Sequence, residues 1–159
     1  MASLNLIKGG LRMSFESEWR DETERAIRAA QEVTKVAAIE MVNYVILQSA
    51  VGNPDLWRSK YVPEGYVGGR WRSNWFLTQT VPSVKMTNEI KNPQSMIGSY
   101  TQQILGKYSE SWIISNNLPY SVPLDEGHSQ QMPAGITEPT ALYVNERIPE
   151  IERAANRKY

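Results

Sequence analysis

The longest regular pattern in the chain runs from about Ser14 to Ala50. Its first half is charged, and three acid-before-base pairs in it have the four-residue spacing that stabilises helices: Glu16–Arg20, Asp21–Arg25 and Glu24–Arg28. Its second half, VTKVAAIEMVNYVILQSAV, is apolar on nearly every side. Ser14 is a suitable N-cap, and Gly52-Asn53-Pro54 is a typical helix end. The pattern predicts one continuous helix over this range.

The predicted helix has about 36 residues, or about 54 Å at 1.5 Å per residue. A compact domain of 159 residues has little use for a helix of that length. Its wide apolar surface fits two arrangements: a central helix of the chain's own core, or a helix partly covered by another subunit. Residues 1–13, with a flexible joint at Gly9-Gly10, are expected to form an N-terminal arm, and residues 14–159 to form a single domain.

Two short strands and a short helix are predicted in the middle of the chain. Residues 75–81 (WFLTQTV) alternate as a strand does and end at Pro82, and residues 112–115 (WIIS) form a second β-rich run. Between them, Asn92-Pro93 is a favourable helix start, with Asn92 as the cap and proline at the first position. Gly106 is predicted to end this helix.

A last helix is predicted from Thr137 to near the end of the chain. It carries one apolar seam that can dock on a sheet or a neighbour: Ala141, Val144, Ile148, Ile151 and Ala155. Pro149 is expected to kink or split it. Taken in order, the elements predict an α+β fold with a long N-terminal helix, a small antiparallel sheet, a short middle helix and a C-terminal helix.

The loop between the first helix and the first strand, residues 53–74, is long and rich in aromatic side chains: Trp57, Tyr61, Tyr66 and Trp71. Its aromatic content predicts that it orders against another surface, because disordered segments contain few aromatics. Three surfaces are possible. The loop can pack over its own domain, form a subunit interface, where Trp, Tyr and Arg dominate, or stack on nucleic-acid bases.

Composition excludes several classes of chemistry. The chain has no cysteine and one histidine, which excludes disulfides and thiolate chemistry and leaves little for an imidazole metal site. No dinucleotide or phosphate-loop motif is present, so we expect no cofactor. We expect no membrane span, since no apolar run reaches about 18 residues. The N-terminal residues do not resemble a signal peptide, and we expect synthesis in the cytoplasm.

Formal charge balances to zero, but it is unevenly distributed. Residues 16–32 contain six acids and three bases, whereas residues 56–107 contain seven bases and two acids. Such runs are usually solvated faces. They also fit acidic and basic surfaces of neighbouring copies that meet, or a nucleic-acid-binding module that uses the basic region 56–107.

Residues 116–136 (NNLPYSVPLDEGHSQQMPAGI) hold the only histidine beside possible catalytic groups. In extended chain, the side chains of His128 and Ser129 point to opposite faces, as do those of Asp125 and Glu126, so neither pair can converge on one substrate atom. We therefore expect no enzyme. The prolines and turn residues around them predict an edge strand followed by a shaped polar loop, which suits docking against a neighbour.

The same segment carries a family resemblance. Its pattern N-x-x-P-Y-x-x-x-L-[DE]-x-G-x-S-x-Q-x-P-x-G resembles the tail-component family of tailed bacteriophages, which comprises tail-completion or minor tail proteins. The matching residues are Asn116, Pro119, Tyr120, Leu124, Glu126, Gly127, Ser129, Gln130 or Gln131, Pro133 and Gly135. Residues 69–75 (GRWRSNW) resemble a second family marker, an arginine-containing segment before a strand. The resemblance spans about residues 14–155.

The resemblance implies a structural protein of the virion, made in the bacterial cytoplasm and located at the neck. It implies a ring, expected to be a hexamer, that joins the tail to the head connector and lets DNA pass through its lumen without sequence readout. Its partners would be copies of itself and other neck and tail proteins, and it would need no cofactor. The alternative is a tail terminator, a protein that caps the tail tube.

Ring contacts join different faces of neighbouring copies. We predict Arg70, Trp71, Arg72 and Trp75 on one side of this contact, with Tyr120, Glu126 and His128 on the other. The full set of interface candidates is Trp57, Tyr61, Arg70, Trp71, Arg72, Trp75, Tyr120, Glu126, His128 and Gln130. The substitution Trp71→Ala is expected to weaken ring assembly more than monomer folding.

Overall fold

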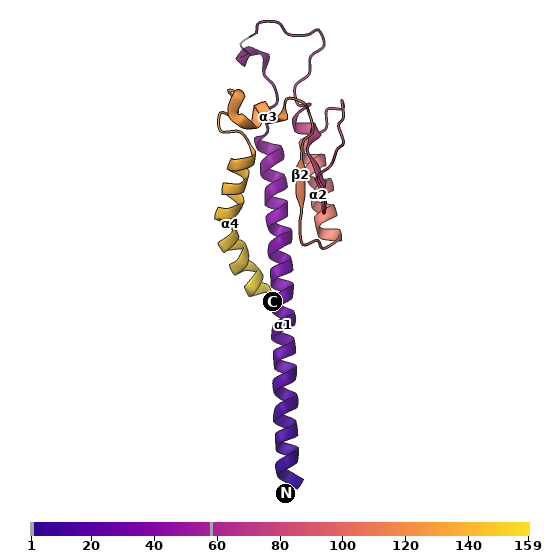
Figure 1. Cartoon of the computed structure of the whole chain (residues 1–159), viewed down its shortest axis with the longest axis vertical. Helices are drawn as coiled ribbons and strands as arrows, with labels where there is room; N and C mark the ends of the chain where they lie inside the picture. The colour runs from indigo at the N-terminus through magenta and orange to yellow at the C-terminus, as the bar shows by residue number, and fades with distance from the viewer. Residues whose placement is uncertain (1, 58) are drawn as a thin grey trace.

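The computed structural model describes residues 2–57 and 59–159, with side chains from residue 15 onward. Helix α1, Ala2–Gln48, has 47 residues and is about 70 Å long at 1.5 Å per residue. Figure 1 shows that the other elements gather around its C-terminal half, while its N-terminal half projects from the body. The chain thus has a packed body and a helical extension.

The predicted helix start at Ser14 is wrong, because α1 already begins at Ala2. Residues 2–13 form the first turns of the same helix and contain no proline. Each glycine of Gly9-Gly10 costs only about 1 kcal/mol relative to alanine in a helix. Residues such as Leu, Lys and Arg around them favour the helix, so it continues through both glycines.

Helices α4 (Thr137–Lys158) and α2 (Pro93–Gly106) pack on different sides of α1 (Figure 1). The body half of α1 is the central core helix, with Val42 and Ile46 fully enclosed. Around it lie apolar residues of every other part of the body, including Leu77, Met96, Leu118 and Ile136. The first of the two predicted arrangements of α1 therefore holds for its C-terminal half.

The sheet is small. Strands β1 (Phe76–Thr78) and β2 (Ile113–Ser115) are antiparallel, with Leu77 opposite Ile114. The first strand is shorter than the predicted range 75–81. After it, residues 83–91 are held by side chains instead of a β-ladder: Ser115, Asn74 and Ser73 accept the N–H groups of Ser83, Thr87 and Lys91. The fold is α+β, as predicted.

The predicted start and end of α2 are confirmed. Asn92 caps α2 through a 3.0 Å bond from the Ser95 N–H, with Pro93 in the first turn, and α2 ends at Gly106. Helix α4 continues through Pro149, so the predicted split is wrong. Buried contacts of Thr140 before the proline, and of Ile151 and Ala155 after it, hold the helix together. At the start of the seam, Thr140 is buried in place of the predicted Ala141.

Four short helical turns complete the chain: η1 Pro54–Leu56, η2 Arg72–Asn74, α3 Ser121–Pro123 and η3 Leu124–His128. Turns η1 and η2 lie inside the predicted loop 53–74. Among the residues that the structure describes, no helix is both long and apolar enough to cross a membrane.

Candidate functional site

A cleft of about 1400 Å³ opens where α1 ends. One wall is the loop of residues 51–71, and the other is the segment 120–133. Six of the ten interface candidates line it: Trp57, Arg70, Trp71, Tyr120, His128 and Gln130. Arg70 and Trp71, predicted for one side of a ring contact, therefore line the same cleft as Tyr120 and His128, predicted for the other side; Arg72, Trp75 and Glu126 do not line it. Sequence reasoning could not see this, because the fold brings positions about fifty residues apart together.

The walls of the cleft are tied to the end of α1. Gln131 accepts the Val51 N–H through its side-chain oxygen at 3.1 Å. Gly68 approaches the Val51 backbone so closely that a Cβ atom there would lie 2.3 Å from the carbonyl oxygen. A side chain at residue 68 would push the two segments apart. These contacts fix both walls of the cleft to the end of α1.

The upper part of the loop is ordered by aromatic contact. The rings of Trp57 and Tyr66 meet edge-to-face with 4.8 Å between their centres. Tyr61, another interface candidate, is 75% exposed and does not line the cleft. The loop 53–74 packs partly over its own domain and leaves an aromatic surface free.

One cation dominates the charge of the cleft wall. Burial raises the pKa of Tyr120, while the positive charge of Arg70 opposes that rise and Tyr66 adds to it. The guanidinium of Arg70 therefore acts across the cleft on the phenol group of Tyr120. Glu126, by contrast, is exposed and does not line the cleft.

Trp71 and Trp75 belong to the core, which corrects their prediction as interface anchors. They are only 4% and 7% exposed, and their rings meet edge-to-face at 5.5 Å. Trp71 donates its indole N–H to Ser121 Oγ at 3.0 Å, and Trp75 donates to Ser49 Oγ at 2.8 Å. Each indole is enclosed with its polar group satisfied. Trp71→Ala should therefore damage folding first, the opposite of the expectation from sequence.

Arg72 is also turned inward. It is half-buried, and its Nε atom is buried without a hydrogen-bond partner among the described residues. The exposed cation of the GRWRSNW segment is Arg70. Arginine and tryptophan alternate in this segment, and that pattern does not show that Arg70 faces solvent while Arg72 is half-buried.

Asp125 has a structural task. Its Oδ1 atom accepts the backbone N–H groups of Ile136 at 2.9 Å and Thr137 at 2.8 Å, at the start of α4. Burial raises the pKa of Asp125, but the bonds to Thr137 and Ile136 outweigh it and hold the pKa below its usual value. Asp125 thus caps α4 from eleven residues away, which no local sequence signal could reveal.

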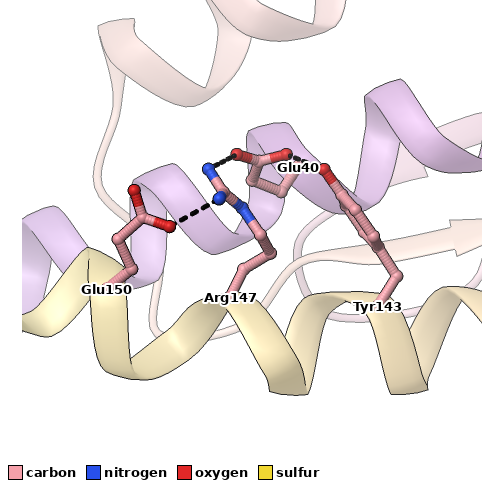
Figure 2. A network of polar contacts seen from close by, with 4 residues as sticks. All are labelled: Glu40, Tyr143, Arg147 and Glu150. Atoms are coloured by element: carbon pink, nitrogen blue, oxygen red, sulfur yellow. Dashed lines mark hydrogen bonds and ion pairs between the residues drawn. The ribbon is translucent and has the colours of Figure 1, made fainter.

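A polar network fastens α4 to α1 (Figure 2). Glu40 of α1 accepts hydrogen bonds from the Tyr143 hydroxyl at 2.9 Å and from Arg147 Nη2 at 3.2 Å. Arg147 also pairs with Glu150 at 2.6 Å. The Tyr143 ring stacks on Tyr44 with centres 4.6 Å apart. These contacts fix the two helices side by side.

The covered part of α1 ends where α4 ends. Lys158, the last residue of α4, pairs with Glu32 of α1 at 2.7 Å. Before Ala29, every described side chain of α1, residues 15–28, is exposed. Phe15 and Trp19 are 66% and 67% exposed. We call residues 15–28 the projecting segment.

The projecting segment has two exposed aromatic side chains on one stripe, which the sequence analysis missed. At 100° per residue, Phe15, Trp19, Glu22 and Ala26 lie on one face of the helix, at spacings of four, three and four residues. That spacing is typical of a helix that packs against a partner. The signal was present in the sequence but was hidden by the surrounding charges.

No protein-family model, curated protein or solved structure matches this chain. Within residues 2–57 and 59–159, no group of three His, Cys, Asp or Glu side chains is placed to hold a metal ion. The function is therefore argued from two surfaces, the cleft and the projecting segment.

Proposed function

We propose that this chain is a structural virion protein of a tailed bacteriophage that forms a ring at the neck. The ring joins the tail to the head connector, and DNA passes through its lumen without sequence readout. One observation carries the proposal: α1 extends beyond the body and exposes Phe15 and Trp19 on one stripe.

An extended helix of this kind suits assembly because it is poorly stabilised alone. Helices without tertiary contacts are marginal in water, and most helical stability comes from packing of an apolar face. A buried aromatic side chain removes about 150–250 Å² from water, at about 25 cal/mol per Å². Enclosing the exposed two-thirds of Phe15 and Trp19 would thus contribute on the order of 5–8 kcal/mol before ordering costs. A partner subunit can supply that enclosure.

The station at the neck rests on the resemblance to the tail-component family in residues 116–135 and 69–75. The exposed, proline-rich segment and the aromatic loop support an assembly role, since both line the cleft at the end of the body. Neutral overall charge agrees with DNA passage without tight binding, because tight non-specific binding needs many Lys and Arg contacts to phosphates.

Cryo-electron microscopy of purified virions, with this chain labelled by an antibody fragment, tests the proposal. We expect label in a ring between the head and the tail. Particles that lack the chain, or carry it only along the tail tube, would contradict the assignment to the neck.

A further inference from the structure

A closed ring needs two different complementary surfaces on each copy. We propose that these are the projecting segment of α1 and the cleft, so that the segment of one copy docks into the cleft of the next. The inference rests on the proposed function, since it names the contact that would build the ring. It accounts for both exposed surfaces with one interface.

The two surfaces lie at opposite ends of the molecule. The cleft begins at Ala50, just past the C-terminal end of α1, and the projecting segment lies in the other half of the same helix (Figure 1). Because α1 is one continuous helix, the segment cannot fold back into the cleft of its own chain. The occupant must come from a second molecule, and a head-to-tail contact between copies follows.

Charge complementarity favours a second copy as that occupant. Residues 15–28 carry five acids and three bases. Arg70 is the one Lys, Arg, Asp or Glu among the described residues that line the cleft, so the cleft carries a net positive charge. Opposite net charges bring these surfaces together and set their register. Pairing of α1 with α1 would instead place two acid-rich segments against each other.

The cleft has room and apolar surface for the aromatic stripe. Its volume, about 1400 Å³, exceeds the range of roughly 300–1,000 Å³ that is typical of small-molecule sites. Leu56, Val67 and Tyr120 line it and are 42%, 64% and 40% exposed. Phe15 and Trp19 would cover these side chains, while Glu22 on the same stripe would approach the cation of Arg70.

Two double variants separate the surfaces. The helix variant, Phe15→Ala with Trp19→Ala, removes the stripe, and the cleft variant, Val67→Asp with Arg70→Glu, makes the cleft repel an acidic helix. All four side chains are exposed, so both variants should fold. Each variant alone is expected to self-associate about 30-fold more weakly than the unchanged chain, the loss typical of an interface hot spot. Sedimentation velocity over a concentration series measures this.

A mixture of the two variants distinguishes a segment-to-cleft contact from a contact between two α1 helices. The helix variant keeps an intact cleft, and the cleft variant keeps an intact projecting segment. The mixture should therefore form one-to-one heterodimers that cannot grow, at concentrations at which each variant alone is largely monomeric. A contact between two α1 helices predicts the opposite, because the cleft variant would still associate with itself.

Matched controls change other exposed residues, away from the proposed contact. Ile27→Ala lies on a different face of α1 and is 52% exposed, and Val84→Asp with Lys107→Glu repeats the chemistry of the cleft variant elsewhere. These controls should associate like the unchanged chain. If the unchanged chain forms rings and the helix and cleft variants do too, the contact is wrong and the proposed function stands. If the unchanged chain stays monomeric at all concentrations, both are wrong.

Discussion

Replacement of Asp125 tests how the end of the body is held together. Its carboxylate is the only side chain among the described residues that accepts the first N–H groups of α4, from Ile136 and Thr137. Asp125→Ala removes both bonds and leaves the helix start uncapped. The same change should loosen the segment that lines the cleft, because Asp125 lies within it.

The magnitude follows from the geometry. Loss of a capping side chain costs about 0.5–2 kcal/mol, and hydrogen bonds to charged groups contribute about 1.5–3 kcal/mol each when well enclosed. Asp125 is only half-buried, so solvent screening reduces these values. We expect a loss of about 2 kcal/mol, which lowers the melting temperature by about 4–8 °C in a chain of this size.

The loss of stability in Asp125→Ala should depend on pH. Hydrogen bonds hold the pKa of Asp125 in the folded state below its usual value. Its contribution to stability is therefore present above the unfolded-state pKa and is lost as pH falls through the lower, folded-state pKa. The difference in melting temperature between the unchanged chain and Asp125→Ala should be full at pH 7 and should shrink under strongly acidic conditions.

The neighbouring acid provides a matched control. Glu126 is exposed, and its side chain makes no hydrogen bond or ion pair with any residue that the structure describes. Glu126→Ala should change the melting temperature by no more than about 1–2 °C, as surface substitutions usually do. Thermal unfolding is followed by circular dichroism at one protein concentration. If Asp125→Ala and Glu126→Ala behave alike at pH 7, the capping role is refuted.

Three further substitutions test the rest of the body by chemical denaturation. Trp71→Ala should cost about 3–5 kcal/mol, whereas the exposed Tyr61→Ala should cost less than about 0.5 kcal/mol; equal effects would contradict the burial of Trp71. Asn74→Ala should cost about 2–4 kcal/mol and speed hydrogen exchange at Thr87, because Asn74 exchanges two hydrogen bonds with Thr87. Glu40→Leu should lower the free energy of unfolding, because the Tyr143 hydroxyl loses its acceptor and Arg147 keeps only Glu150; unchanged stability would show the network to be unimportant.

Features encoded by neighbouring residues were predictable. The start of α2 is a local matter, since the Asn92 side chain reaches the N–H three residues on and Pro93 needs no donor. The positions of β1 and β2 followed from short β-rich runs. The α+β architecture was predictable because each helix and each strand has its own pattern of apolar residues along the sequence.

Features that depend on distant residues were not predictable. Trp71 and Trp57 occur in one aromatic loop, yet Trp71 is buried because Ser121, fifty residues later, offers its hydroxyl. In the sequence, Asp125 is a possible catalytic group beside His128. In the fold, its carboxylate accepts the Thr137 N–H at the start of α4. Aromatic and charged residues are compatible with either core or surface, and only the fold decides between them.

The cleft could be predicted only in part. The sequence singled out Arg70, Tyr120, His128 and Gln130, but it assigned them to separate faces. The stripe of Phe15 and Trp19 was overlooked because the acid-before-base pairs around it account for a helix by themselves. Its exposure became evident only when α4 was seen to end beside Glu32.

Assembly of this chain with itself through its exposed surfaces can be measured directly. Light scattering coupled to size-exclusion chromatography, followed by negative-stain microscopy of the eluted peak, tests it most directly. We predict a mass several times the 18.1 kDa of one chain and closed rings of about six copies, in keeping with the prevalence of closed symmetry among homo-oligomers. A single species of 18.1 kDa across the accessible concentration range would contradict the account.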